Sequence, residues 1–443
     1  MIVGAGLSGL YAARLLQKAG LSVAVLEARD RVGGRAFSER LANGKVVDFG
    51  AQWITPEQKR IWALTEELGL TKVETNTRGK AIVQVRGELR RLSGSVPPLS
   101  WLGLLDAWRL GWRIEHLAKQ VSVSAPWEHP QATQLDSVSF DAWLKQNSMS
   151  GEGYDYWTHV VTGGMCAATN RFSPLEVIHQ IASMGGLSAL ENADTHIIEQ
   201  GAQSIANLLA EALEESVCLN SEVRSLQLAG QAVRATTAAG DFYGKHVILA
   251  LPPQLISKIS VAPALIKSEK QENRDWVLGK VIKNVVVYDN AWWRLDGFSG
   301  IADTPAEPID FMADSSAEDS DSGVLVAFAS GPNAIQMSEL DDGTRKSIVL
   351  SHVQKILGKS SAEPTHFSST DWSAEPYSCG GYASRRPVGS WTEYRSFLTD
   401  FNSPVHLAGT ETAEVWRSYM EGALQSAERA SEEILSEMSD RAQ

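Results

Sequence analysis

The sequence predicts an α/β fold in which a nucleotide-binding unit comes first in the chain. Three observations support this prediction. A glycine-rich turn joins a short apolar run to an amphipathic helix at the N-terminus, strand and helix patterns alternate again after residue 201, and a last strand-to-helix unit begins near residue 404. Apolar strands that alternate with helices are typical of a parallel sheet covered by helices.

The N-terminal unit has the spacing Gly-x-Gly-x-x-Gly at Gly4, Gly6 and Gly9. The first glycine allows a tight turn after the strand, and the second allows backbone N–H groups to approach a pyrophosphate. The third allows a helix over residues 10–18 to pack closely on the sheet. Phosphates would lie at the N-terminus of that helix, where unpaired N–H groups and the helix dipole favour anions. We expect a Rossmann-like dinucleotide site; the alternative is a glycine-rich turn without a ligand.

An acidic residue, Glu27, closes the next apolar run, residues 21–26. It follows the glycines by about twenty positions, as the dinucleotide-binding pattern requires. A carboxylate there accepts hydrogen bonds from a ribose 2′-OH and repels a 2′-phosphate. The sequence therefore disfavours NADP.

Composition and charge indicate a soluble globular chain of two or three domains. The 443 residues are 43% hydrophobic and 21% charged. Lys plus Arg number 40 and Asp plus Glu number 53, and the net charge of −13 argues against nucleic acid or an anionic membrane as partner. A cationic substrate is compatible with this charge, although a solvated surface is its simpler meaning.

We expect a cytoplasmic protein without a membrane anchor. Cys166, Cys218 and Cys379 show neither disulfide nor zinc spacing, which fits a reducing compartment. No apolar run approaches the length of about 18 residues that a membrane helix needs, and neither end carries a signal-peptide pattern. Because only three residues precede Gly4, fewer than in a usual strand, a missing N-terminal stretch with a cleaved export signal stays open.

The middle of the chain predicts a change of architecture. Residues 47–53 suggest a buried segment with a close backbone approach at Gly50, and residues 61–70 predict a short helix. Residues 79–184 indicate a largely helical inserted region that includes an amphipathic stripe at Trp101, Trp108 and Trp112. We expect this stripe to pack between domains; a membrane-surface face is the alternative, and its Arg and Glu content disfavours it.

A second α/β pattern follows Gly201. It predicts a helix over 204–213, strands over 217–223 and 232–237, and an apolar run over 246–251. The β-branched residues of 281–288 predict a further strand. The last unit leads from a strand over 404–408 through Gly409 into a helix that ends near Met438.

Motifs of several other chemistries are absent from the sequence. There is no Gly-x-Ser-x-Gly, no His-Glu-x-x-His and no P-loop. The nine histidines show no metal-ligand spacing, so no metal site is predicted.

Three further blocks join the N-terminal unit. They are residues 29–35, which contain Gly33-Gly34-Arg35; residues 278–283, which end at Lys283; and a C-terminal block containing Gly409, Glu411, Trp416, Tyr419 and Met420. In order and approximate spacing, the four blocks resemble the flavin-containing monoamine oxidase family over nearly the whole chain.

The resemblance implies a Rossmann-like FAD-binding domain assembled from three segments, with an α+β substrate domain inserted. The expected FAD domain comprises 1–72, 197–272 and 373–443, and the substrate domain comprises 73–196 and 273–372. Glu27 would hold the adenosine ribose, Arg35 would meet the pyrophosphate, and Val223 would contact adenine. The full set of implied cofactor residues is Gly4, Gly6, Gly9, Glu27, Ala28, Gly34, Arg35, Gly50, Ala51, Gln52, Trp53, Val223, Trp372, Gly409, Glu411, Tyr419 and Met420.

The same resemblance implies the catalytic residues Lys283, Tyr382 and Tyr419. Lys283 matches a lysine that holds a water beside the flavin, and the two tyrosines match rings that enclose the amine. Desolvation disfavours the ammonium form of an amine, while aromatic faces favour positive charge that develops on its carbon–nitrogen unit. A surface lysine and core aromatics are the alternatives for these residues taken singly.

The function implied is oxidation of a primary or secondary amine to an imine, which water converts to an aldehyde or ketone, with O2 reduced to H2O2. An L-amino-acid oxidase on the same scaffold is the first alternative, and a non-enzymatic nucleotide-fold binding protein is the second. A homodimer is compatible with the sequence, which does not determine which amine is oxidised or which acceptor takes the electrons.

Two positions depart from the family pattern. Members with covalent FAD carry a cysteine directly before the first tyrosine, where this chain has Gly381; Cys379 is two residues away, about 6.6 Å along an extended strand. We therefore predict non-covalent FAD. Arg417, with Arg385 and Arg386, departs too: solvent-facing arginines are expected, and a pocket-facing arginine that would suit a carboxylate-bearing substrate stays open.

Overall fold

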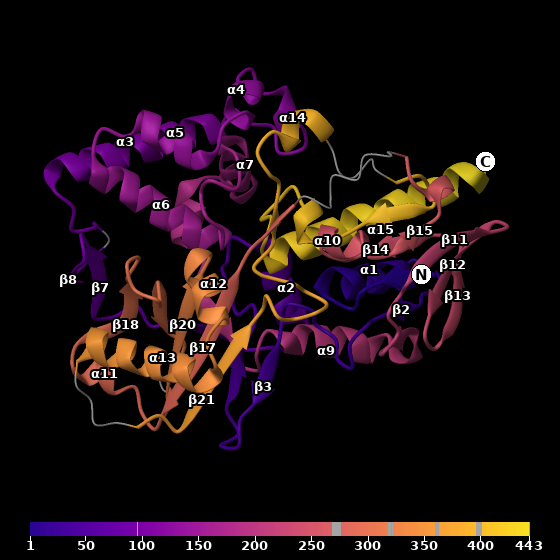
Figure 1. The fold of residues 1–443 in the computed structure, drawn as a ribbon. Coiled ribbons are helices and arrows are strands. Elements are labelled where there is room, and N and C mark those ends of the chain that lie inside the picture. Colours follow the sequence, from indigo (N-terminus) through magenta and orange to yellow (C-terminus); the bar gives the residue numbers. More distant parts are fainter. Residues whose placement is uncertain are drawn as a thin grey trace.

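The structure, a computed structural model, describes residues 1–94, 96–267, 276–317, 320, 322–358, 363–395 and 401–442. The predicted domain boundary at 272 and 273 lies outside these residues. In Figure 1 the molecule has a helical part, a strand-rich part below it, and a third part on the right that holds both termini.

A five-stranded parallel sheet lies at the centre of the part that holds the termini. Its order is β10 (Val217–Cys218), β2 (Val25–Leu26), β1 (Ile2–Val3), β14 (Val247–Leu249) and β23 (Val405–Leu407). Strands from three distant stretches of the chain are thus hydrogen-bonded in one sheet.

Three helices cover one face of this sheet. They are α1 (Leu7–Lys18), α9 (Gln203–Ala212) and α15 (Met420–Ala442), and α1 packs on both others. Their apolar residues share a core with Ile2 and Ile248 of the sheet. The other face packs on a second sheet, in the order β13 (Gly240–Gly244), β12 (Ala232–Thr237), β11 (Ser225–Ala229) and β15 (Ser260–Val261).

A seven-stranded mixed sheet forms the lower part in Figure 1. Its order is β21 (His366–Asp371), β17 (Val281–Tyr288), β20 (Gly323–Ser330), β19 (Phe311–Asp314), β18 (Phe298–Asp303), β7 (Lys80–Val85) and β8 (Glu88–Leu92). One face packs on α11 (Trp292–Leu295), α12 (Pro332–Ser338) and α13 (Asp342–Leu357). Residues of β17 alternate between the faces, so Val281, Lys283 and Val285 point away from these helices.

A helical layer lies above this sheet and shares one apolar core. Its helices are α3 (Trp101–Ala118), α4 (Ala132–Asp136), α5 (Phe140–Asn147), α6 (Gly151–Met165), α7 (Pro174–Met184), α8 (Leu187–Glu191) and α14 (Ser390–Tyr394). Shorter connections are made by α2 (Lys59–Glu67), α10 (Pro253–Ile256) and the pairs β3 (Ser38–Arg40) with β4 (Val46–Asp48) and β16 (Val277–Leu278) with β22 (Ser384–Arg385).

A three-stranded sheet marks where the chain passes between its parts. It has the order β5 (Trp53–Ile54), β9 (His196–Ile198) and β6 (Lys72–Glu74), and both of its pairings are antiparallel. The outgoing strand β6 and the returning strand β9 therefore lie side by side, and both crossings occur at one place.

Residues 79–184 are largely helical, as expected, but they begin with the hairpin β7–β8, which turns at Arg86 and Gly87 with φ values of 52° and 80°. The expectation for the tryptophan stripe is wrong. The tryptophan stripe does not pack between domains: Trp101, Trp108 and Trp112 are 77%, 67% and 59% exposed. Gly103, Asp106 and Leu110 form the buried face of α3 instead.

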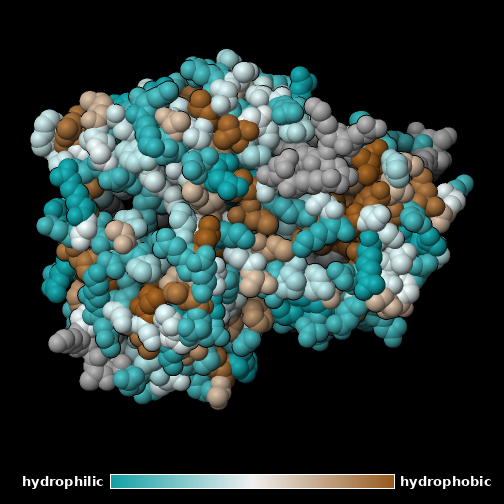
Figure 2. Space-filling view, in the orientation of Figure 1, coloured by the Kyte–Doolittle hydropathy of each residue, from teal (hydrophilic) through white to brown (hydrophobic). Residues whose placement is uncertain are grey.

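The visible face of the molecule in Figure 2 is mostly hydrophilic, with separate apolar patches rather than one continuous apolar surface. Among the described residues, no helix combines the length and the apolar character that crossing a bilayer would require.

Candidate active site

One large cavity connects the parallel sheet to the seven-stranded sheet and the helical layer. Its volume is about 1150 Å³, above the roughly 300–1,000 Å³ of ordinary small-molecule sites. Gly4, Gly6 and Glu27 line one end, and Lys283 and Tyr382 line the other. The space therefore suits a long ligand together with a smaller one.

The glycine turn leaves room at this cavity. A Cβ added at Gly6 would meet no atom within 4 Å, whereas one at Gly9 would lie 1.9 Å from the Gly4 carbonyl oxygen. Gly6 is also the N-cap of α1 and supplies no side-chain hydrogen bond to the helix N-terminus. The cavity therefore borders helix N–H groups that an anion can accept from.

Glu27 lies at the carboxyl end of β2 and is 4% exposed. Its Oε2 accepts from the N–H of Ala5 at 2.7 Å, and its Oε1 accepts from the N–H of Arg29 at 3.0 Å. Each carboxylate oxygen has a second lone pair. Glu27 is thus held rigidly while it keeps acceptor capacity toward the cavity.

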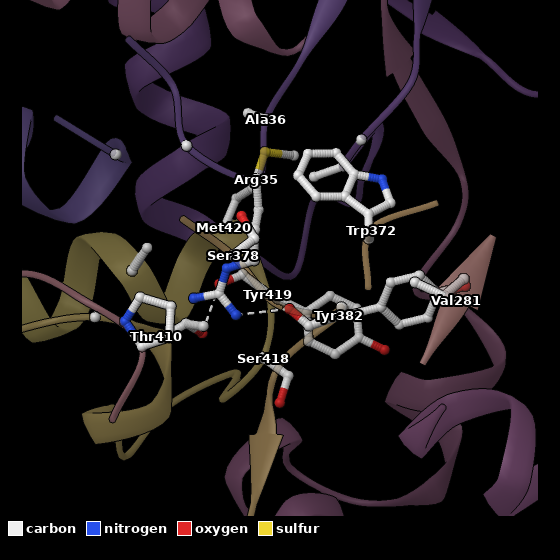
Figure 3. A pocket seen from close by; sticks show the side chains of 18 of the residues that line it. Arg35, Ala36, Val281, Trp372, Ser378, Tyr382, Thr410, Ser418, Tyr419 and Met420 are labelled. Atoms are coloured by element: carbon white, nitrogen blue, oxygen red, sulfur yellow. Dashed lines mark hydrogen bonds between the residues drawn. The ribbon is translucent and has the colours of Figure 1, made fainter. Parts of the chain in front are cut away.

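Arg35 lines the cavity and forms an ion pair with Glu411, which lies behind the wall. Nη1 and Nη2 of Arg35 donate to the carboxylate at 2.7 and 3.0 Å, and Nη1 also donates to the carbonyl of Tyr382 at 2.7 Å (Figure 3). The guanidinium of Arg35 holds the pKa of the Glu411 carboxyl below its ordinary value, although burial opposes this. The pair ties residue 35 to the C-terminal segment.

One part of the cavity wall connects Arg35 with Lys283. Gly50, Ala51, Gln52 and Trp53 belong to it, and so does Trp372, whose Nε1 donates to the Phe49 carbonyl at 3.0 Å. A Cβ on Gly50 would lie 2.1 Å from the Arg35 carbonyl oxygen and 2.9 Å from the Trp372 ring. Only glycine allows this close approach.

Lys283 reaches the cavity from the middle of β17 and is 2% exposed. Its Nζ donates to the Gly50 carbonyl at 2.9 Å and to Oε1 of Gln52. Burial lowers the pKa of Lys283 to about 7, against the opposing effect of Asp48. This lysine is therefore not a surface residue, and its amine exchanges a proton near neutral pH.

Tyr382 and Tyr419 both line the cavity beyond Lys283 (Figure 3). Tyr382 is 40% exposed, and its ring packs edge to face on Phe328 with centroids 6.3 Å apart. Tyr419 packs edge to face on Trp416 at 5.0 Å. Burial raises the pKa of both phenols above the ordinary value, so neither ring carries charge at neutral pH.

Comparison with known proteins identifies the family. Residues 7–435 match the family model of flavin-containing amine oxidoreductases. The chain belongs to this family. It is 32% identical over 450 residues to the flavin-containing amine oxidase B of Sus scrofa, covering 99% of this chain and 86% of that one. It is 30% identical over 451 residues to an L-amino acid dehydrogenase of Synechocystis, covering 98% and 94%.

A solved structure agrees with this assignment. Putrescine oxidase bound to putrescine superposes with a TM-score of 0.92 at 33% identity, covering 98% of both chains. The mixed α/β fold of this flavin amine oxidase is therefore that of putrescine oxidase, and the cofactor of the family is FAD.

The residues of this chain fit FAD. The open space at Gly6, the uncapped start of α1 and the acceptor Glu27 lie at one end of the cavity. Of the predicted cofactor residues, those that line the cavity are Gly4, Gly6, Glu27, Ala28, Gly34, Arg35, Gly50, Ala51, Gln52, Trp53, Val223, Trp372, Gly409, Tyr419 and Met420. Gly9 and Glu411 do not line it: the first packs under Gly4, and the second holds Arg35.

The expectation that three arginines face solvent is wrong. Arg385, Arg386 and Arg417 are 1%, 2% and 1% exposed. Of the three, Arg385 lines the cavity, where its Nη1 donates to Gln180 at 2.8 Å and to Ser418 at 2.6 Å. Arg417 pairs with Glu176 at 2.9 Å instead.

Sequence reasoning missed the acidic residues of the cavity wall, which are Asp194, Asp303 and Asp310. Burial raises the pKa values of Asp194 and Asp310 to about 6. Asp303 bonds to His159, and this partner raises the pKa of the histidine against the effect of burial. No motif surrounds these residues, so they become visible only when the chain is folded.

Cys379 does not reach the cavity. Its Sγ donates to the Pro376 carbonyl at 3.2 Å and accepts from Lys258 Nζ at 3.4 Å, while Gly381 and Tyr382 form the wall. The thiol therefore does not contribute to the wall at the position where covalent family members carry a cysteine.

Proposed function

We propose that this flavin amine oxidase removes two electrons and two protons from a small amine that carries a second basic nitrogen. The observation that carries the proposal is the placement of Lys283, Tyr382 and Tyr419 on one cavity whose far end fits a dinucleotide. FAD, when bound, accepts the electrons from the carbon next to nitrogen. The remaining functions belong to residues of the chain.

Tyr382 and Tyr419 supply walls that orient the amine. Both rings are neutral and apolar, so the cavity disfavours the ammonium form and favours the amine whose lone pair drives oxidation. Their faces favour the positive charge that develops on the carbon–nitrogen unit. The walls rather than an acid–base pair hold the reacting geometry.

Lys283 is placed to accept and release a proton at Nζ. With a pKa near 7, it accepts or releases a proton without a large energetic cost in either direction. We propose that this amine serves electron transfer to O2, which is reduced to H2O2. The imine product then reacts with water to give an aldehyde or ketone and an amine or ammonia.

Asp194 supports the choice of substrate class. Asp194 lies on the cavity wall, close enough to raise the pKa values of both Tyr382 and Tyr419, and no charged partner among the described residues offsets the effect of burial on its own pKa. A second cationic nitrogen on the substrate would neutralise it. The name of the similar structure, putrescine oxidase bound to putrescine, agrees with such a substrate.

An amino acid is the second candidate substrate. Arg385 lines the cavity, and its Nε has no hydrogen-bond partner among the described residues. Burial lowers the pKa of Arg385 to about 10, a cost that a substrate carboxylate would offset. The similarity to an L-amino acid dehydrogenase favours this candidate, whereas the contacts of Arg385 with Gln180 and Ser418 weigh against it.

A peroxide-release assay over monoamines, diamines and amino acids tests the proposal. Asp194→Asn should raise KM for diamines at least about tenfold while KM for monoamines changes little. Glu199→Gln, an exposed acid outside the cavity wall, is the matched control. Turnover of amino acids alone, lost in Arg385→Met, would replace the first candidate by the second.

Three broader assignments complete the proposal. We propose an FAD domain of 1–72, 197–272 and 373–443 and a substrate domain of 73–196 and 273–372, supported by the two separate large sheets and by the crossing at β6 and β9. The three free thiols support a cytoplasmic location. A homodimer is testable by the mass of the holoenzyme in solution.

A further inference from the structure

Two histidines and a glutamate converge at the end of the parallel sheet remote from the active site. His246 directly precedes β14, His406 is the middle residue of β23, and Glu437 lies in the last turns of α15. The ligand atoms of these three side chains all lie within 4.8 Å of one another. None of the three lines the active-site cavity.

The sheet register explains why the two histidines meet. Ile248 pairs with His406, and His246 lies two residues before Ile248. Side chains two residues apart in a strand share a face, so both histidines stand on the face that α15 covers. Glu433 and Glu437 are four residues apart on that helix and point to one side of it.

The distance between the two histidine nitrogens matches that of a tetrahedral metal centre, and the carboxylate lies slightly farther away. His246 Nδ1 lies 3.4 Å from His406 Nε2. Two nitrogens bound to one zinc at 2.0–2.1 Å and at the tetrahedral angle would be about 3.4 Å apart. Glu437 places Oε2 3.7 Å from His246 Nδ1 and Oε1 3.9 Å from His406 Nε2, a few tenths of an ångström longer than a bound carboxylate would require.

Surrounding groups orient these ligands. His406 Nδ1 lies 3.1 Å from Oε2 of Glu433, which fixes the proton on Nδ1 and leaves the lone pair of Nε2 facing the cluster. Arg429 holds Glu433 in turn at 2.6 Å. Ser403 donates to Oε2 of Glu437 at 2.7 Å. A carboxylate behind a metal-binding histidine is the usual outer support of a zinc site.

The burial of the three side chains is also typical of a metal site near the protein surface. His246 and His406 are 9% and 6% exposed, whereas the side chain of Glu437 is 33% exposed. The carboxylate therefore adjoins solvent, from which a metal can enter and a water can complete the coordination. A long His–His hydrogen bond accounts for the 3.4 Å distance, but it does not account for the carboxylate that faces both nitrogens.

We propose that His246, His406 and Glu437 bind a zinc ion, with Glu433 as a positioning residue. The ion would join β14, β23 and the last turns of α15, and it would do so far from the reacting atoms. Its effect is expected on stability, because a ligand that binds only the folded state raises the free energy of unfolding.

Zinc binding to the tag-free, FAD-loaded protein tests the proposal after chelator treatment and dialysis. We expect one zinc per chain by calorimetry and by metal analysis, together with a rise of several degrees in Tm. Affinity should fall at least tenfold in Glu437→Gln and 10–100-fold in Glu433→Gln. His116→Gln, which changes an exposed histidine on α3, is the matched control and should keep full affinity.

Folding failure is separable from loss of the site. Glu437→Gln changes a partly exposed side chain, and an unchanged flavin spectrum and amine turnover would show that the variant is folded. Binding of Co²⁺ gives a second readout, since a tetrahedral ion adds visible bands to the flavin difference spectrum. The absence of stoichiometric zinc, or equal zinc affinity in the wild type and in Glu437→Gln and His406→Asn, would overturn the proposal.

Discussion

At the scale of single residues, the proposed active site contains a lysine in a place that is unfavourable to its charge. Lys283 is buried on β17 and lines the cavity together with Tyr382 and Tyr419, and burial lowers its pKa to about 7. Burying such a group lowers the free energy of unfolding, but the group is useful for proton transfer. The effect on stability and the effect on turnover can be measured separately.

Replacing Lys283 by Met should lower turnover at least about tenfold and yet stabilise the fold at neutral pH. The folded-state pKa is below the ordinary value of 10.5, so the cost of burying the ammonium is fully present below pH 7 and disappears as pH rises toward 10.5. After loss of the hydrogen bonds to Gly50 and Gln52, we expect a gain of about 1–3 kcal/mol at pH 7 in urea unfolding.

The gain in stability should shrink as the pH rises from 7 toward 10.5, because the folded state already holds a neutral lysine there and the unfolded state progressively loses its proton. Lys280→Met, at a partly exposed position three residues earlier that does not line the cavity, is the control and should change neither quantity much. A variant at 283 that keeps full turnover would remove this lysine from the catalytic group.

Tyr419 is expected to act through its ring rather than its hydroxyl. Tyr419→Phe keeps the wall and should change kcat/KM by less than about threefold. Tyr419→Ala removes the wall and should lower kcat/KM at least about tenfold. Steady-state peroxide release with one amine measures both; equal losses in the two variants would instead assign the phenol a direct role.

At the scale of elements, two glycines of the turn before α1 are expected to have different roles, one in binding and one in folding. Gly6 borders open space, and Gly9 packs against the Gly4 carbonyl. Gly6→Ala should therefore leave the apoprotein as stable as the wild type and weaken FAD binding. Gly9→Ala should lower Tm of the apoprotein, because its Cβ would overlap backbone. Flavin titration and thermal unfolding test the pair, and comparable destabilisation by both would contradict this division.

Sequence patterns predicted the elements whose signals are local. The β-branched run of β17 is confirmed at Val281–Tyr288, and β12 at Ala232–Thr237. The hairpin β7–β8 was missed although Arg86-Gly87 between alternating residues indicates a turn. The helix α3 was predicted, but its tryptophans face solvent, because Gly103, Asp106 and Leu110 supply a closer-packing face.

The sequence could not predict sites whose residues meet only through the pairing register of neighbouring strands. His246 and His406 are 160 residues apart and meet only because β14 and β23 are parallel neighbours. Asp194 reaches the cavity from the end of the helical layer, next to β9, with no motif around it. By contrast, Gly6, Glu27 and Lys283 belong to sequence blocks with fixed spacing, and the cavity includes all three.

At the scale of the whole molecule, the cavity is lined by all the segments that the chain brings together. Gly6 comes from the first segment, Val223 from the second and Tyr419 from the last, while Lys283 comes from the seven-stranded sheet. A ligand that fills this cavity would contact every part at once. FAD is therefore expected to contribute to stability as well as chemistry.

Removal of FAD should lower Tm, and its return should restore Tm in proportion to the logarithm of free FAD. A hundredfold excess over Kd stabilises by about 2.7 kcal/mol, provided that the unfolded chain does not bind.

Because Gly381 directly precedes Tyr382 and Cys379 does not line the cavity, the flavin should leave the polypeptide completely on acid denaturation. Absorbance of the precipitate and the supernatant measures this release. Yellow colour that stays with the precipitate would show a covalent bond, and Cys379→Ser would then identify or exclude this thiol as its partner.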